Sequence, residues 1–166
     1  MSGNRWILIN VNGLKHLKLD LSSKLSDGLI GEFSLSTLET LNACNTNISF
    51  ENLYKLLSKA EKLKDLSLDY CKNISDDFIG ELVFSSLETL SVNRANISSE
   101  NLYKLIIKAD KLKALSLNGY KNLSEVIFDE FNSSSLETFK ADETNITSES
   151  LFNLRPFNTE VQHPLI

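Results

Sequence analysis

A repeated leucine constrains the fold of this chain more than any other feature of its sequence. The leucines that define the repeat are Leu14, Leu38, Leu63, Leu87, Leu112 and Leu136, and consecutive ones are 24 or 25 residues apart. The segment that starts at Ser85 also aligns without a gap on the segment that starts at Ser36. Internal repetition at a fixed period indicates that one structural unit is used several times.

Each unit contains apolar residues three and five positions after its first leucine. These pairs are Leu17 and Leu19, Leu41 and Ala43, Leu66 and Leu68, Leu90 and Val92, Leu115 and Leu117, and Phe139 and Ala141. A further apolar residue closes each unit, at Leu25, Ile48, Ile74, Ile97, Leu123 and Ile146. A period of two over so few residues predicts a short strand with one buried face.

The segments between the strands are predicted to be helical. In SFENLYKLL, Leu53, Leu56 and Leu57 form one apolar stripe, and Ser49 is in the position of an N-cap. The segment from Ser98 repeats this arrangement. The other units have a shorter connection, whose expected inward pairs are Leu29 and Phe33, Phe78 and Leu82, and Ile127 and Phe131.

These repeats resemble the leucine-rich-repeat family, whose pattern LxxLxLxx(N/C)x(x)L stands here as LKDLSLDYCKNI from Leu63 and LETLSVNRANI from Leu87. Cys71 occupies the buried position of the family's cysteine-containing subclass. The resemblance implies an α/β solenoid, an arc with about six parallel strands on its concave face and helices on its convex face. It divides a single domain, 1–166, into an N-terminal cap (1–13), six repeats (14–154) and a capping or disordered tail (155–166).

Composition excludes several classes of partner. The chain has 166 residues, a net charge of −5 and a pI of about 5.1, so we expect neither nucleic acid nor a membrane surface as a partner. The first residues lack the features of a signal peptide, and two cysteines do not make a disulfide framework. We therefore expect a cytoplasmic protein.

Five N-x-S/T motifs start at Asn47, Asn73, Asn96, Asn122 and Asn145. Their spacings alternate between 26 and 23 residues, which follows from the repeat and has no counterpart in glycan placement. In this interpretation Asn47 ends a loop, Ile48 enters the core and Ser49 starts a helix. The motifs are expected to carry no glycan.

Stacked parallel strands turn each column of the repeat into a row of neighbouring side chains, about 4.8 Å apart. One such row is Lys15, Glu39, Lys64, Glu88, Lys113 and Glu137, in which the charge alternates in sign. Neighbours in this row can pair, so we expect it to stabilise the register.

The outward strand positions and the residues just after them form the expected partner-binding surface. Its residues are His16, Lys18, Asp20, Asn42, Cys44, Asn45, Asp65, Ser67, Asp69, Tyr70, Ser91, Asn93, Arg94, Asn118, Lys140, Asp142 and Glu143. Tyr70 and Arg94 are the expected hot spots, because tyrosine and arginine are the residue types that anchor interfaces.

Catalysis is not expected. The best constellation, His16, Cys44 and Asp65, comes from three successive units and from different rows, so the thiol should lie beyond hydrogen-bond reach of the imidazole. The aspartates Asp20, Asp69 and Asp142 should lie too far apart to share a metal, and two histidines are too few for a zinc site. The sequence predicts no catalytic residue, no cofactor and no metal.

The first hypothesis is a non-enzymatic module that binds one folded protein, such as an enzyme, and regulates or inhibits it by covering a functional surface. The repeats resemble those of small effectors of intracellular bacterial pathogens, which implies host cytosol as an expected location, reached by a route other than Sec. We expect a monomer outside the complex. The alternatives are a substrate-recognition subunit of a ubiquitin-ligase complex and an enzyme that uses Cys44.

Overall fold

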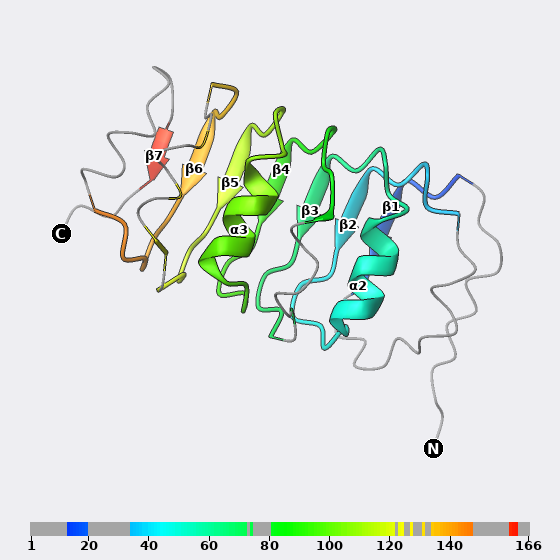
Figure 1. The fold of residues 1–166 in the computed structure, drawn as a ribbon, viewed down its shortest axis with the longest axis horizontal. Helices are drawn as coiled ribbons and strands as arrows, with labels where there is room; N and C mark the ends of the chain where they lie inside the picture. The colour runs from blue at the N-terminus through cyan, green and yellow to red at the C-terminus, as the bar shows by residue number, and fades with distance from the viewer. Residues whose placement is uncertain are drawn as a thin grey trace.

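The computed structural model describes residues 13–19, 34–72, 74, 81–121, 123–124, 127, 131, 134–147 and 160–162. They form an α/β structure in which seven parallel strands lie side by side in chain order (Figure 1). The strands are β1 (His16–Lys18), β2 (Thr40–Asn42), β3 (Asp65–Ser67), β4 (Thr89–Ser91), β5 (Ala114–Ser116), β6 (Thr138–Lys140) and β7 (Glu160–Gln162).

The register of the sheet follows the leucine repeat. Leu17, Leu41, Leu66, Leu90, Leu115 and Phe139 are the middle residues of six strands, and each pairs with the next. All six are buried, while the residues on either side of them point to the opposite face of the sheet and are at least partly exposed. The predicted inward and outward positions of these six strands are confirmed.

The six expected strands are present as β1 to β6, and the sheet has a seventh strand, β7, that the repeat pattern did not predict. Strand β7 lies in the segment that the sequence left open as a cap or a disordered tail, and it pairs with β6 so that Val161 stands beside Phe139. This strand comes 22 residues after β6, and Asn158 stands where the other units have their first leucine. The short spacing and the missing leucine hid it from the repeat pattern.

The two predicted helices are confirmed as α2 (Phe50–Leu57) and α3 (Ser99–Ile106). Ser49 accepts a hydrogen bond from the amide of Asn52, and Ser98 accepts one from Asn101, so both serines cap a helix N-terminus as expected. Both helices bury their apolar stripe in the same core as the middle residues of the strands. Among the described residues, both helices therefore lie on one face of the sheet and no helix lies on the other.

The shorter connections also contribute to this core. Leu82, Ile127 and Phe131 are buried, and so are the closing residues Ile48, Ile74, Ile97, Leu123 and Ile146. Leu25, Leu29, Phe33 and Phe78 lie outside the described residues, as do residues 1–12 of the predicted cap 1–13. No helix in the described part of the chain is long and apolar enough to cross a membrane.

Candidate partner-binding surface

The face of the sheet opposite α2 and α3, called the open face below, consists of the first and third residues of the strands β1 to β6. Its side chains are polar or small: His16 and Lys18, Thr40 and Asn42, Asp65 and Ser67, Thr89 and Ser91, Ala114 and Ser116, and Thr138 and Lys140. Every one of them is at least partly exposed. The open face therefore offers a broad polar surface to the solvent.

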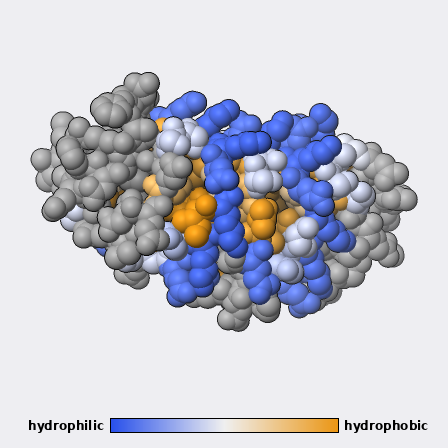
Figure 2. Space-filling model, turned by 45° about the horizontal axis from the view of Figure 1, so that its top comes forward, coloured by the Kyte–Doolittle hydropathy of each residue, from blue (hydrophilic) through white to orange (hydrophobic). Residues whose placement is uncertain are grey.

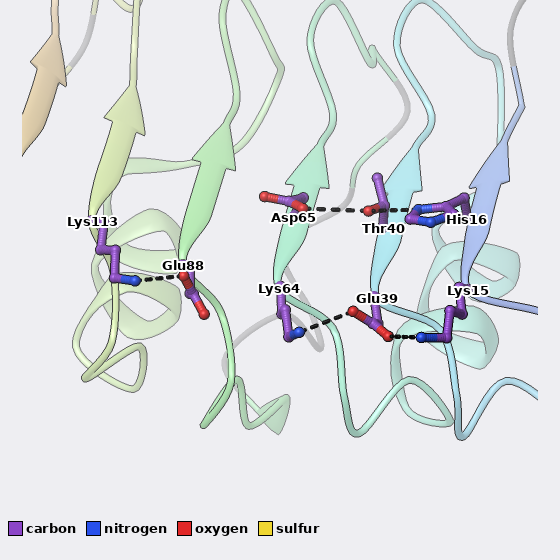
Figure 3. A network of polar contacts seen from close by, with 8 residues as sticks. All are labelled: Lys15, His16, Glu39, Thr40, Lys64, Asp65, Glu88 and Lys113. Atoms are coloured by element: carbon purple, nitrogen blue, oxygen red, sulfur yellow. Dashed lines mark hydrogen bonds and ion pairs between the residues drawn. The ribbon is translucent and has the colours of Figure 1, made fainter.

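The alternating row of lysine and glutamate lies at the beginning of the strands (Figure 3). Glu39 pairs with Lys15 and with Lys64, each at 2.9 Å, and Glu88 pairs with Lys113 at 2.7 Å. The hydrogen bond from Lys64, followed by that from Lys15, lowers the pKa of Glu39 to about 2. The pairs that form confirm that this row links neighbouring strands.

A second row crosses the first three strands. Nδ1 of His16 lies 3.1 Å from Oγ1 of Thr40, and this hydroxyl donates to Oδ2 of Asp65 at 3.3 Å (Figure 3). Thr40, which the sequence did not single out, thus joins His16 to Asp65. The position of a threonine between a histidine and an aspartate in the same column is the signal that could have predicted this link.

Cys44 does not join these two residues. Its Sγ lies 2.8 Å from Oγ of Ser67. Cys44 also stands four residues beyond the partner of His16 in the register, which corresponds to roughly 13 Å along a strand. His16, Cys44 and Asp65 are therefore not brought together as a catalytic group.

Beyond the strands, three side chains form a hydrogen-bonded ladder. Oδ1 of Asp69 accepts from Oγ of Ser91 at 2.7 Å and from the amide of Asn93 at 2.8 Å. Asn93 accepts in the same way from Ser116 and from the amide of Asn118, and Asn118 accepts from the amide of Asp142. The sequence assigned Asp69, Asn93 and Asn118 to the partner surface, but the Oδ1 atom of each one accepts hydrogen bonds from the following unit.

The next column has left-handed backbone and is called the αL column below. Its residues are Asn45, Tyr70, Arg94, Gly119 and Glu143, with φ of 53°, 58°, 50°, 74° and 57°. The amides of the first four donate to the following unit, to Asp69, Asn93, Asn118 and Asp142. Bulky residues in this conformation cost about 1–2 kcal/mol each, whereas glycine and asparagine adopt it more readily.

Two large side chains of the αL column reach into the solvent. Tyr70 is 48% exposed, and the Arg94 side chain is 50% exposed. Nη2 of Arg94 donates to Oε2 of Glu143, two units away, and the arginine side chain crosses above Gly119 on its way. Sequence reasoning missed Gly119, although it is the only glycine in a column of larger residues.

The remaining predicted surface residues are dispersed. Lys18 and Lys140 lie at opposite ends of the open face, on β1 and β6, and Asp142 follows β6. Asn45 is exposed in the αL column, and the carboxamide of Asn42 accepts from the amide of Cys44. Asp20 lies outside the described residues.

The second cysteine is part of the core. Cys71 is 1% exposed, and its thiol donates to the carbonyl of Ala43 at 3.0 Å. Burial raises the pKa of this thiol. The predicted buried position of Cys71 is confirmed, and among the described residues no three His, Cys, Asp or Glu side chains are grouped as a metal site would require.

Away from the open face, hydrophobic exposure is small and scattered. Figure 2 shows bands of hydrophilic side chains with hydrophobic atoms visible in separate places between them. Apart from Tyr70, the large hydrophobic residues that the described part of the chain exposes are Val83 and Ile107, which are 73% and 39% exposed. Their equivalents 49 residues earlier are Ser34 and Ser58, so neither position needs an apolar residue for folding.

No protein-family model matches the chain, and no curated protein is significantly similar to it.

Proposed function

We propose that this chain is a leucine-rich-repeat solenoid that binds one folded protein partner and has no enzymatic activity of its own. Parallel strands in chain order, a register that advances by one repeat per strand and helices on one face support this assignment. The open face would be the inner, concave side. The partner is regulated or inhibited because the chain covers one of its functional surfaces.

The observation that carries this proposal is the presence of large exposed side chains at unfavourable backbone positions. Tyr70 and Arg94 have positive φ, and about half of each side chain is exposed. Neither the backbone conformation nor burial in the core gives a reason for tyrosine or arginine there. Both residue types are, however, enriched among the residues that dominate protein interfaces.

The surroundings of these two residues fit an interface. Small hydroxyl side chains on β4 and β5 give a partner close access to the sheet, and the charged Lys18, Lys140 and Asp142 would form its polar rim. Free cysteines at Cys44 and Cys71 fit a reducing compartment such as a cytosol. We infer that the chain is a monomer until the partner binds.

The test is affinity capture from the native cell with three forms of the protein. The wild-type chain should retain a partner, and a variant with Tyr70→Ala and Arg94→Ala should lose it while keeping its melting temperature within a few degrees. Ile107→Ser is the matched control, because it removes an exposed large side chain at the end of α3, outside the open face and the αL column. It should retain the same partner.

The captured partner is then titrated with each form in purified solution. Equal affinity of the wild-type chain and the double variant would exclude the αL column as the anchor. Loss of affinity in Ile107→Ser but not in the double variant would instead place the binding surface on the helix side.

A further inference from the structure

Gly119 lies directly beneath the Arg94 side chain. A Cβ atom built on Gly119 would lie 2.5 Å from Cγ of Arg94, 2.7 Å from Nε and 3.1 Å from Cδ. Real Cβ atoms do not approach other heavy atoms so closely, and Cγ is near the backbone of Arg94, where the side chain cannot easily give way. The path of Arg94 over the turn that follows β5 therefore depends on the absence of a side chain at Gly119.

The end of this path is the ion pair with Glu143. Within the described part of the chain, the contact of Nη2 with Glu143 is the only side-chain hydrogen bond of Arg94. A guanidinium group has five N–H donors, so the bridge leaves those on Nε and Nη1 for another acceptor. Arg94 is thus held in place while part of its hydrogen-bonding capacity faces the solvent.

We propose that Gly119 is a positioning residue of the binding surface: it lets Glu143 hold Arg94 in a fixed orientation in which the free N–H groups of the guanidinium donate to a backbone carbonyl oxygen of the partner. This inference rests on the proposed function, since it concerns the same surface. It assigns a role in binding to a residue that has no side chain to contact a partner.

The charge of the bridge favours a carbonyl group as the ligand. Glu143 already balances the positive charge of Arg94, and Asp142 lies next to Glu143 in the chain. A second carboxylate would therefore meet nearby negative charge, whereas a neutral carbonyl oxygen would not. An arginine that is fixed before binding also loses less side-chain entropy in the complex.

The first arm of the test uses the free protein. The Nε–Hε NMR signal of Arg94 is recorded with and without Glu143→Gln, in the wild-type background and in the Gly119→Ala background. We expect Glu143→Gln to shift the signal in the wild-type background only. Asn45→Ala is the control for backbone strain, because Asn45 has a φ of 53° and already carries a Cβ. It should leave the response to Glu143→Gln intact. A response that persists in Gly119→Ala would overturn the proposal.

The second arm measures affinity for the captured partner. Arg94→Ala and Gly119→Ala should each weaken binding by about tenfold or more, and the double variant should lose little beyond either single variant. If Arg94→Ala weakens binding and Gly119→Ala does not, the role of Gly119 is wrong while the proposed function stands. If neither variant weakens binding, the proposed surface itself is wrong.

Salt distinguishes the two kinds of acceptor. If the ligand is a carbonyl group, the loss of affinity for the partner caused by Arg94→Ala should be the same at low and at high salt. A loss that shrinks markedly as salt rises would indicate a carboxylate on the partner and would overturn the assignment of the ligand.

Discussion

At the scale of single residues, the αL column separates side chains that serve the fold from side chains that do not. Each unit must turn at this position, and asparagine or glycine satisfies the turn at little cost. Asn45 and Gly119 fit this requirement, whereas Tyr70, Arg94 and Glu143 do not. The choice of Tyr70 and Arg94 from residue type alone could not have included this argument, because the sequence does not reveal the sign of φ.

Replacing Tyr70 by asparagine is expected to stabilise the free protein. The φ of Tyr70 is 58°, and its half-exposed ring contributes little to the core, so Tyr70→Asn should raise the free energy of unfolding by up to about 1 kcal/mol. The reverse change, Asn45→Tyr, should lower it by a similar amount. Urea unfolding of both variants measures this, and a loss of stability in Tyr70→Asn would contradict the argument from strain.

Cys44 occupies the ladder position that Asp69 and Asn93 fill in later units. Its thiol reaches Ser67, but an asparagine there could accept from both Ser67 and the amide of Asp69, as Asn93 does from the next strand. We expect Cys44→Asn to raise the free energy of unfolding by about 0.5–1.5 kcal/mol. Cys44→Ala, which can make neither bond, should be no more stable than the wild-type chain in the same urea titration.

At the scale of elements, the charged row ties neighbouring strands together and gives stability a dependence on pH. The folded chain holds the pKa of Glu39 at about 2, against an ordinary value of 4.5. A lowered carboxyl pKa contributes stability that is complete above the ordinary value and is lost as the pH falls towards the folded value. The contribution of Glu39 should therefore disappear between pH 4.5 and pH 2.

This predicts how Glu39→Gln behaves in thermal unfolding. At neutral pH the variant should melt slightly below the wild-type chain, and the two melting temperatures should converge as the pH falls through that interval. Glu137→Gln is the control, because Glu137 belongs to the same row but makes no ion pair within the described part of the chain. If the difference in melting temperature between Glu39→Gln and the wild-type chain stayed constant down to the lowest pH, the result would contradict the lowered pKa of Glu39.

The elements that the sequence predicted are those with a strong local period. Buried leucines at fixed spacing determine the strands β1 to β6, and a serine cap followed by an apolar stripe determines α2 and α3. Strand β7 escaped prediction because its unit is shorter and lacks the first leucine. The bridge from Arg94 to Glu143 could not be predicted either, because it joins residues 49 positions apart through the space above a third unit.

At the scale of the whole molecule, each strand is bonded only to the strands that precede and follow it in the chain. No contact between distant units closes the sheet within the described residues, so stability is built from local units and the interfaces between them. Opening can then begin at either end and proceed inwards. The interior strands β3 and β4 should be the last to open.

Hydrogen exchange tests this directly. In the wild-type chain, amides in β3 and β4 should exchange most slowly, and those in β1 and β7 fastest. Phe139→Ala removes a side chain that is 1% exposed in β6 and should destabilise the core by about 3–5 kcal/mol. Because this loss acts on the units next to β6, exchange should accelerate more in β5 to β7 than in β1 and β2. Equal acceleration in all strands would mean that the sheet unfolds as one cooperative unit, in which the energy of each interface is shared by the whole molecule.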